Sequence, residues 1–595
     1  MSEALASRTG WRSRSPRLLA FRALCAFGVL CTAHVAAQLL QEPHSGVTAA
    51  LVGIPLALLT AAGVRAAPAS FQSCAARPRL AVAPHPVLLL TGCLALGLVV
   101  LWPALSAWLM PFDDSINHLA RIYVMVHGAA DPLLSRFYAI EWHVLPNLGL
   151  ELTLPWLVAA TDIYTAGKLF TVATLALMLA GPFAVHRALY RQWSLGPLVA
   201  AVFLYNGVTR YGMLNYQLGI GLMLLAIASW IALRSHGAAV RSAMSLVCVL
   251  VLFACHLMAL AVYGLTIFSY ELWLACVVWR AHRRRWTDLA VLVLPFVPML
   301  VLMALGPARD EAIDPRGVVW GGLHARLDGL RYLVLSYAPR WDLLALIAIL
   351  AGLLWAIRKR RVFMHPFGWV LLAVVLPVYL VIPNEAMGTW GAAVRMPVAV
   401  MFVLFGVLRW NLPDATAQRA FLLAVTALAV FRLAPVEAVV RQYNAIADDV
   451  RASLPLIQPG SRVLIAADYS RREEALQSIQ ELPMLALIER SSLVSIAYSH
   501  PQQQILVVRP PYRAMTGGYS DQPVALPDLL KHTLPDPDAQ PLYDPSGRLY
   551  WADWERNYDY VFLIYRSRQP NPAPDRLALL RDGDHFQLFR VIHPH

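Results

Sequence analysis

The sequence predicts a mainly α-helical protein. We expect a polytopic bundle of about 13 transmembrane spans, interfacial helices in the first long external loop, and a C-terminal external α/β domain. Hydrophobic residues make up 58% of the 595 residues and charged residues only 14%, whereas soluble domains carry about 25% charged residues. Apolar runs of spanning length recur from residue 18 to residue 434 and then stop. We therefore expect a transmembrane domain over 1–435 and an external domain over 436–595.

The expected spans are apolar runs that approach the roughly 20 residues needed to cross a bilayer. The first run follows a basic N-terminal segment and has no small-residue cleavage site after it, so we expect an uncleaved span. The run 194–209 is short, and we divide 243–280 near Tyr263 and Gly264. The expected spans are 18–40, 46–66, 86–108, 163–185, 194–209, 212–234, 243–261, 262–280, 287–305, 341–357, 366–383, 394–411 and 418–434.

Arginine and lysine placement predicts the orientation of these spans. Basic clusters occur in alternate loops, for example at 280–285 and 358–361, and cytoplasmic loops are enriched in such residues. This places the N-terminus in the cytoplasm of a bacterium, and the poorly basic loops 109–162, 306–340 and 384–393 on the periplasmic side of the inner membrane. The formal net charge of +13 is therefore a topology signal, and we expect no nucleic-acid partner.

The cysteines exclude two kinds of structure. Most of the seven lie inside apolar runs, and no CxxC or Cys/His ligand spacing occurs. A disulfide framework and a zinc site are therefore not expected.

The segment 109–162 predicts two helices that lie in the membrane interface. In "INHLARIYVMVHG", apolar residues recur at helical spacing, and Asn117, His118 and Arg121 lie off that stripe. A second helix follows in "LPNLGLELTLPWLVAAT", which is opened by Pro146 and carries Glu151. An acidic pair, Asp113 and Asp114, stands directly before the first helix.

With this layout the chain resembles the glycosyltransferase-C superfamily, polytopic enzymes that move a sugar from a polyprenyl-phosphate carrier. The "DD" of "PFDDSINHLAR" matches the acidic motif of that superfamily's first external loop. The stretches "DDSINHLARIY", "DPLLSRFY" and "PNLGLELTLPWL" resemble a group of uncharacterised bacterial integral membrane proteins of this type. The resemblance covers 1–435, although two spans here precede the one before the acidic loop, unlike in the best-known members.

The resemblance implies a catalytic role for the acidic pair. Asp113 or Asp114 would be the general base that takes the proton of the acceptor hydroxyl, with His118 as a helper. Alternatively, both carboxylates would bind a divalent cation, Mg²⁺ or Mn²⁺, through their oxygens. The competing interpretation is structural, because Asp is a favoured N-cap and anions suit a helix start.

Cationic and polar residues of the outer face are candidate substrate ligands. The anionic phosphate leaving group needs a cation nearby, and Arg395, Arg121 and Arg210 are candidates. Asn215 and Tyr216 could line a sugar pocket. The competing interpretations are a snorkelling arginine at a span end for Arg395 and interhelical hydrogen bonds for Asn215 and Tyr216.

Two polar residues inside the predicted spans are expected to be structural. His256 and Glu271 stand in apolar surroundings, and we expect pairing there rather than a proton path or a haem ligand.

After residue 435, short apolar runs predict strands, with a helix between the first two. These runs are 461–468, 504–510, 558–565 and 585–592. Asp468, His500 and Asp559 are possible site members of this domain, which would position an acceptor or be purely structural.

The function that these patterns favour is transfer of a sugar from a polyprenyl-phosphate-linked donor to a glycan, lipid or protein acceptor at the outer face of the membrane. One alternative is a transporter or flippase, although no internal repeat of the kind common in transporters is present. Another is a non-catalytic envelope assembly protein on a transferase-like scaffold. The sequence does not fix the sugar or the acceptor.

Overall fold

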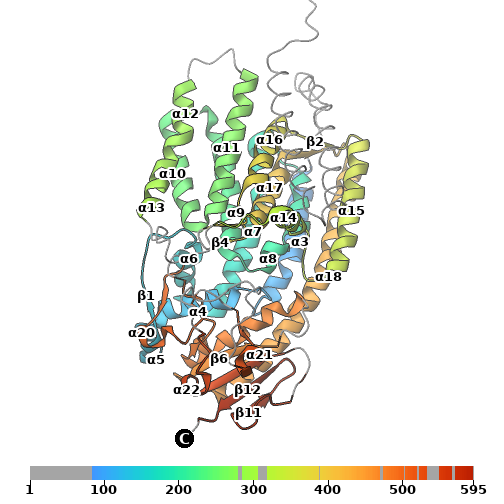
Figure 1. Ribbon diagram of the computed structural model, residues 1–595. Helices are drawn as coiled ribbons and strands as arrows, with labels where there is room; N and C mark the ends of the chain where they lie inside the picture. Colours follow the sequence, from blue (N-terminus) through green and yellow to red (C-terminus); the bar gives the residue numbers. More distant parts are fainter. Residues whose placement is uncertain are drawn as a thin grey trace, which may run out of the picture.

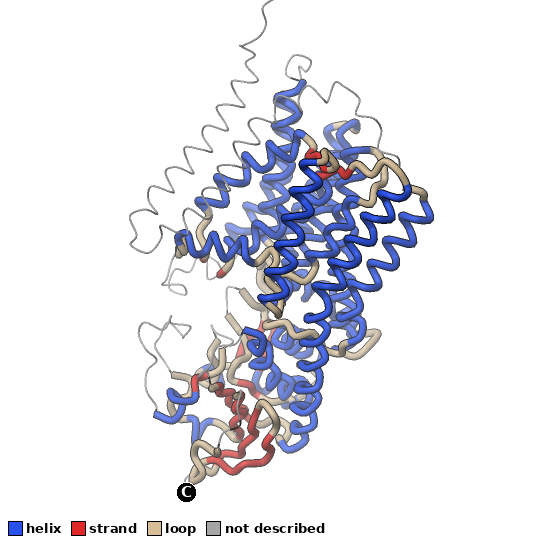
Figure 2. Tube along the Cα trace, turned by 90° about the vertical axis from the view of Figure 1, so that its right-hand side faces the viewer, coloured by secondary structure: helices blue, strands red, loops and turns tan. Residues whose placement is uncertain are grey.

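The computed structural model describes residues 84–278, 285–305, 318–386, 389–468, 474–500, 503–518, 522–531, 549–565, 568 and 570–593. These residues form a helical bundle with a sheet-containing C-terminal domain at one end (Figures 1 and 2). The bundle end that carries residues 107–162 and the C-terminal domain is called the loop end below. The opposite end, which carries Arg187, Arg234 and Lys359, is called the basic end.

Within the described residues, eight helices are long and apolar enough to cross a membrane. Two shorter apolar helices accompany them in the bundle, and a third, Gly149–Val158, lies in the loop 109–162. The long helices are α3 (Pro86–Ser106), α7 (Ile163–Tyr190), α9 with η2 (Leu214–Ala232 and Leu233–Ser235), α10 (Ala238–Cys255), α11 (Leu257–Val278), α12 with η3 and α13 (Arg285–Val293, Leu294–Phe296 and Val297–Leu305), α15 (Pro339–Arg358) and α18 (Ala415–Ser453). The shorter ones are α16 (Pro366–Val381) and α17 (Ala392–Val407).

Every expected span from residue 86 onward corresponds to an apolar helix except 194–209. The predicted spans 18–40 and 46–66 lie outside the described residues. The division near Tyr263 was wrong: the helices α10 and α11 separate at His256, whose Nδ1 accepts the N–H of Met258 at 3.0 Å. A polar side chain that caps the second helix therefore sets this break.

The prediction of a spanning helix over 194–209 was wrong. The segment forms a 3₁₀ helix, η1 (Gly196–Phe203), and a short helix, α8 (Gly207–Arg210). The side chain of Asn206 accepts the N–H groups of Val208 and Thr209, and so starts α8 as a separate helix. The segment is buried against α3, α7, α17 and α18. Irregular backbone is tolerated at membrane depth where protein surrounds it.

Close packing of α7 against α9 forms the centre of the bundle. A Cβ on Gly181 would lie 2.6 Å from Leu224, and one on Gly221 would lie 2.7 Å from Leu177. Small residues at these positions let the two helix backbones approach, as is typical inside membranes. By contrast, most of the surface of α15 and of α12–α13 is not covered by protein, which fits contact with lipid.

The long loop contains α4 (Ser115–His127), α5 (Pro132–Phe137), β1 (Tyr138–Ile140) and α6 (Gly149–Val158). The two predicted helices are present, but α4 does not lie on a surface. Its polar residues Asn117, His118 and Arg121 are buried, because the C-terminal domain covers the face that the bundle leaves open (Figure 1). In α6, Trp156 is 80% exposed, as expected for an interfacial helix.

The C-terminal domain is built on a mixed sheet of six strands with the order β11-β12-β10-β6-β7, and β9 also pairs with β6. The strand β6 is parallel to its neighbours, and β12 is antiparallel to β10 and β11. The sheet strands are β6 (Arg462–Ala467), β7 (Leu493–Val494), β9 (Val524–Ala525), β10 (Tyr560–Ile564), β11 (Leu577–Asp582) and β12 (Phe586–Val591).

One predicted strand joins the domain to the loop instead. The strand β8 (Leu506–Val508) pairs antiparallel with β1. The helix expected after β6 is mainly the 3₁₀ helix η6 (Glu474–Met484) followed by α19 (Leu485–Arg490). The predicted boundary at 435/436 falls inside α18, which runs on to Ser453, so the division into two domains stays a prediction.

The remaining elements are short. They are α14 (Gly322–Arg331), β2 (Val362–Met364), β3 (Glu385–Ala386), β4 (Thr389–Trp390), β5 (Leu408–Trp410), η5 (Leu454–Leu456), α20 (Pro510–Arg513), α21 (Leu526–Lys531) and α22 (Trp554–Asn557).

Candidate active site

The chain between α3 and α4 is anchored to α18. The Asn444 side chain of α18 accepts the N–H groups of Trp108 and Leu109, each at 3.2 Å, and donates to the Leu109 carbonyl at 2.8 Å. These bonds fix the direction in which the chain leaves α3. The acidic pair follows a few residues later.

The backbone of the acidic pair packs against the turn after α8. The N–H of Asp113 donates to the Arg210 carbonyl at 3.0 Å. At Gly212, φ is +72°, and a Cβ there would lie 3.1 Å from the Asp114 nitrogen and 3.0 Å from Phe112 Cβ. Only glycine fits this turn without displacing the acids.

Asp114 occupies the N-cap position of α4 but does not cap it. Its side chain makes no hydrogen bond to the N–H groups of the first turn. Instead, the Asp114 carboxylate lies 3.0 Å from His118 Nε2, and its side chain is 39% exposed whereas that of His118 is 6% exposed. The Asp114 carboxylate therefore does not cap the helix, which was the structural role considered for the acidic pair.

The partners of His118 determine its tautomer. Its Nδ1 contacts Nη2 of Arg121, and an arginine side chain can only donate. Nδ1 is therefore the acceptor, and Nε2 carries the hydrogen that His118 donates to Asp114. His118 thus orients the Asp114 carboxylate through its Nε2 atom.

Arg121 is held by Glu151 of α6, which sequence reasoning noted but gave no role. The Glu151 Oε1 atom lies 2.8 Å from Arg121 Nε and 2.6 Å from Nη2, and both side chains are almost fully buried. Arg121 was predicted as a substrate ligand, yet it is buried in an ion pair below His118. The sequence did indicate an ion pair for Glu151, because a carboxylate inside an apolar helix needs a cationic partner. It did not indicate that this partner is Arg121.

Arg395 lies in the first turn of α17, after Gly391 with φ of +88°. Its Nη1 donates to the Trp390 carbonyl, and its charge interacts electrostatically with Asp114. The hydroxyl of Tyr216 donates to the Arg395 carbonyl at 2.6 Å. Tyr216, predicted as a sugar contact, therefore anchors the backbone of the arginine.

Arg210 and three aromatic rings complete the loop end. Arg210 is buried. Burial of Tyr337 and the charge of Asp113 raise the pKa of Tyr337 well above its ordinary value, and the charge of Arg210 acts in the opposite direction. The Tyr211 ring lies 5.6 Å from that of Tyr332 and 5.5 Å from that of Trp390. Trp390 is 38% exposed, so the cluster reaches the surface beside Arg395.

The side chain of Asn215 forms hydrogen bonds with the backbone of the long loop. Its Oδ1 accepts the N–H of Leu150 at 2.5 Å, and its Nδ2 donates to the Asn147 carbonyl at 2.7 Å. The side chain thus fixes the start of α6 against α9. Its predicted contact with a sugar remains a prediction.

No cluster of three or more His, Cys, Asp and Glu side chains that could hold a metal occurs among the described residues. Asp113 and Asp114 are adjacent in the chain, and Mg²⁺ can bind through one or two carboxylates while water and substrate phosphate complete its shell. A metal at the acidic pair stays a prediction.

No protein-family model and no curated protein matches the chain. One solved structure is similar: ArnT from Cupriavidus metallidurans in the apo state. The similarity has a TM-score of 0.45 and 12% sequence identity, and covers 85% of this chain and 97% of that chain.

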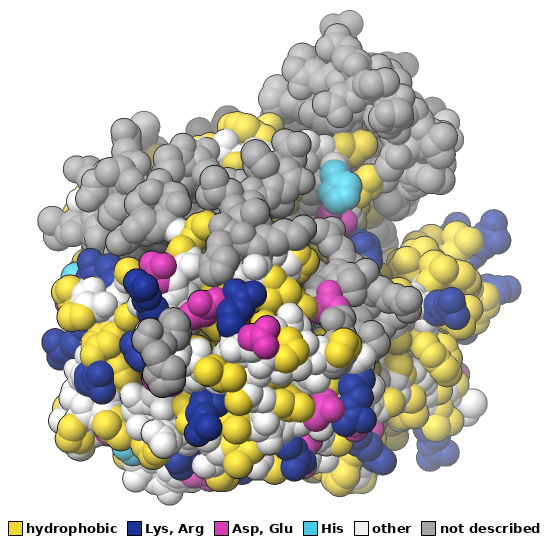
Figure 3. Space-filling view, turned by 60° about the horizontal axis from the view of Figure 1, so that its bottom comes forward, with side chains coloured by type: hydrophobic (Ala, Val, Ile, Leu, Met, Phe, Trp, Pro, Cys, Tyr) yellow, Lys and Arg dark blue, Asp and Glu magenta, His cyan; other side chains and the backbone are white. Residues whose placement is uncertain are grey.

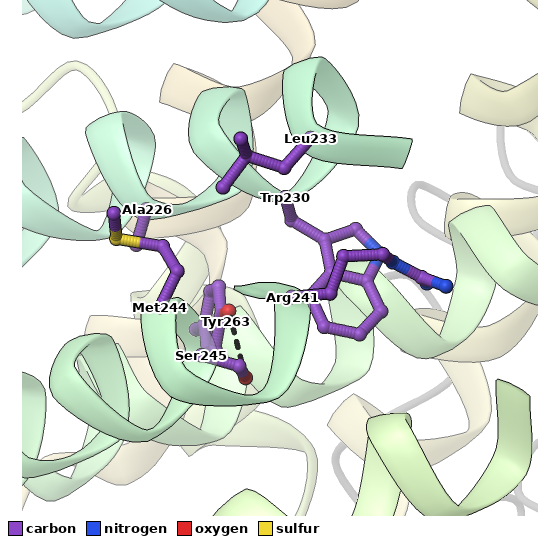
Figure 4. A pocket seen from close by; sticks show the side chains of 7 residues that line it. All are labelled: Ala226, Trp230, Leu233, Arg241, Met244, Ser245 and Tyr263. Carbon is purple, nitrogen blue, oxygen red and sulfur yellow. Dashed lines mark hydrogen bonds between the residues drawn. The ribbon is translucent and has the colours of Figure 1, made fainter. Parts of the chain in front are cut away.

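The polar residues near the basic end are structural, as predicted. Glu271 lies 3.2 Å from Arg234 and 3.1 Å from Arg241, and Asp288 bridges the same two arginines. Arg241 also lines a small cavity with Trp230, Ser245 and Tyr263 (Figure 4), which leaves no room for a water molecule. Glu271 and Asp288 thus compensate the charges of Arg234 and Arg241.

The site members suggested for the C-terminal domain are not brought together as a site. Asp559 forms a two-pronged ion pair with Arg462, with distances of 2.6 and 3.1 Å, and links the starts of β10 and β6. Asp468 donates its N–H to Ile564 at the far end of the same strands. His500 is buried in the turn after β7.

Proposed function

We propose that the protein is a membrane glycosyltransferase that moves a sugar from a polyprenyl-phosphate-linked donor to an acceptor at the outer face of the bacterial inner membrane. The observation that carries this proposal is the state of Asp114. Its carboxylate stands at a helix start without capping it, is oriented by His118, and lies within electrostatic range of Arg395.

These groups suit a displacement at an anomeric carbon. The acceptor hydroxyl oxygen forms the new bond to that carbon while its proton passes to the Asp114 carboxylate, which acts as general base. The bond between the carbon and the phosphate oxygen breaks, and the electron pair leaves with the phosphate. Arg395 and Arg210 supply positive charge for that leaving group.

Asp113 would act as a ligand of a divalent cation. Its N–H donates to the Arg210 carbonyl, so the backbone of this acid is fixed against that of the proposed phosphate contact. With Asp114 it would hold Mg²⁺ or Mn²⁺ against the donor phosphate. The aromatic cluster of Tyr211, Tyr332 and Trp390 offers apolar faces beside Arg395 for the sugar ring.

The placement of charges supports the proposed orientation. Arg187, Arg234 and Lys359 mark the basic end, which by the positive-inside rule faces the cytoplasm. The acidic pair, α6 and the C-terminal domain then face the periplasm (Figure 1). The exposed Trp156 of α6 suits the headgroup region of the bilayer, where a lipid-linked donor presents its phosphate.

The test is transfer by the purified full-length protein in lipid nanodiscs. The wild-type protein is given radiolabelled polyprenyl-phosphate sugars and an extract of envelope lipids and glycans. We expect labelled product, and a loss of at least about 100-fold in D114N, the scale of general-base catalysis. D113N should also lose activity, and chelation of divalent cations should reduce the rate if the acids hold a metal.

The matched control is E141Q, which alters an exposed acid of the same loop and should leave the rate unchanged. Movement of the lipid-linked sugar across the bilayer without product formation would instead indicate a flippase. Full transfer by folded D114N would refute the role of Asp114.

A further inference from the structure

The first turn of α4 has its N-terminal cap in the C-terminal domain. The N–H of Asn117, the third residue of the helix, donates to Oε2 of Glu481 at 3.3 Å. This N–H is one of those that an N-cap side chain normally accepts. Glu481 belongs to η6 and is 3% exposed, and its negative charge lies at the helix end that favours anions.

The C-terminal domain also holds the Asn117 side chain. Its Nδ2 donates to Glu481 Oε1 at 3.5 Å and to the Ile496 carbonyl at 3.1 Å, and its Oδ1 accepts the N–H of Tyr498 at 3.2 Å. The side chain is 1% exposed. The start of α4 is therefore fixed from outside the bundle.

Other helices of the chain show what Asp114 would otherwise do. Asp131 accepts two N–H groups at the start of α5, Asp162 does so for α7, and Asn206 does so for α8. Asp114 has the same side chain as two of these and stands at the same position, yet makes no such bond. Two things differ at α4. The backbone of Asp114 has ψ of 11°, whereas the three capping residues are extended, and Glu481 already accepts an N–H of the first turn.

We infer that Glu481 is a positioning residue: it caps α4 in place of Asp114 and so leaves the Asp114 carboxylate to His118 and the substrate. The C-terminal domain is then a working part of the active site, because without its cap the first turn of α4 competes for Asp114. This rests on the proposed function for its catalytic meaning, but the capping itself is independent of activity.

Hydrogen exchange tests the cap. The full-length protein in nanodiscs is followed by mass spectrometry over peptides that cover residues 112–122. D114A alone should leave exchange in the first turn of α4 unchanged. E481A should raise it, and E481A/D114A should raise it by about 5- to 30-fold, the effect of a lost cap. If D114A accelerates exchange while Glu481 is intact, Asp114 is the cap and the inference is wrong.

Transfer kinetics test the consequence. E481A should lower kcat about 10-fold or more with little change in the KM for the donor, whereas E481Q, whose amide oxygen accepts the same N–H, should retain most of the activity. The control is E489A, which removes another contact between the C-terminal domain and the bundle, at Tyr164 and Arg451, and should leave kcat unchanged.

The two proposals fail in different ways. If the wild-type protein shows no transfer but the exchange pattern holds, the proposed function fails and the cap stands. If transfer occurs and E481A is as active as the wild-type protein, the positioning role fails and the function stands.

Discussion

At the residue scale, two adjacent aspartates differ in what surrounds them. The Asp113 backbone is tied to Arg210, whereas the Asp114 side chain is tied to His118. Behind His118 stand Arg121 and Glu151, so a short chain of charged and polar groups runs from the site into the interior. The orientation of the Asp114 carboxylate depends on this chain, because each member fixes the orientation of the next.

The buried pair of Arg121 and Glu151 makes a prediction about stability. E151A leaves the arginine charge buried without its partner and should lower the free energy of unfolding by about 3–5 kcal/mol. Replacing both residues, as in R121M/E151M, should cost much less, because no uncompensated charge remains. Denaturant unfolding of the detergent-solubilised protein measures both changes.

The stability of R121M/E151M should not be matched by its activity. R121M/E151M removes the donor to His118 Nδ1, so His118 can adopt the other tautomer and no longer donates reliably to Asp114. Transfer should therefore fall even where the fold is retained. A stable, fully active double variant would contradict the proposed orientation of His118.

Sequence reasoning found candidate site residues but not the residues that hold them. Asp114, His118 and Arg395 were singled out by charge and by position near span ends; the structure pairs Asp114 with His118, and the catalytic role of the three stays a prediction. Glu481 and Asn444 could not be found in this way, since they lie more than 300 positions from their partners. No local pattern encodes a cap or an anchor supplied by a distant segment.

At the element scale, hydropathy located the helices well and their breaks poorly. Length and apolar content suffice to identify a span, so all but one of the predicted spans in the described range appear as helices. The breaks depend on single polar side chains. Asn206 starts α8 after the 3₁₀ helix, and His256 starts α11. Hydropathy averaged over a window of residues could not predict either hydrogen bond.

The turn at Gly212 allows a matched test of its close packing. G212A forces a positive φ on alanine and drives its Cβ into the backbone of Asp114, so it should cost about 2–4 kcal/mol. G322A has a similar φ of +55° but meets no described atom within 4 Å, and should cost only about 1–2 kcal/mol. Thermal unfolding in detergent ranks the two variants.

Activity gives a second reading of the same pair. G212A displaces the segment that carries Asp113 and Asp114 and should lose transfer, whereas G322A should keep it. Equal stability and equal activity of the two variants would show that the turn after α8 does not position the acids.

At the scale of the whole molecule, the C-terminal domain contacts both the long loop and the bundle. The strand pair β1–β8 and the Asn117 contacts join the domain to the long loop, and the bond from Tyr164 to Glu489 joins it to α7. The face of the domain turned away from the bundle carries charges of both signs between apolar side chains (Figure 3). Such a mixture of charges is typical of a surface in contact with water.

The orientation across the membrane can be tested by cysteine labelling in a background that lacks the seven native cysteines. Glu141 at the loop end and Lys359 at the basic end are both exposed. A membrane-impermeant maleimide, applied to cells with a permeabilised outer membrane, should label Glu141→Cys but not Lys359→Cys. Disrupting the inner membrane should expose both. Because a polyprenyl-linked donor at the outer face can reach only groups on that side, the reverse pattern would place Asp114 in the cytoplasm and refute transfer at the outer face.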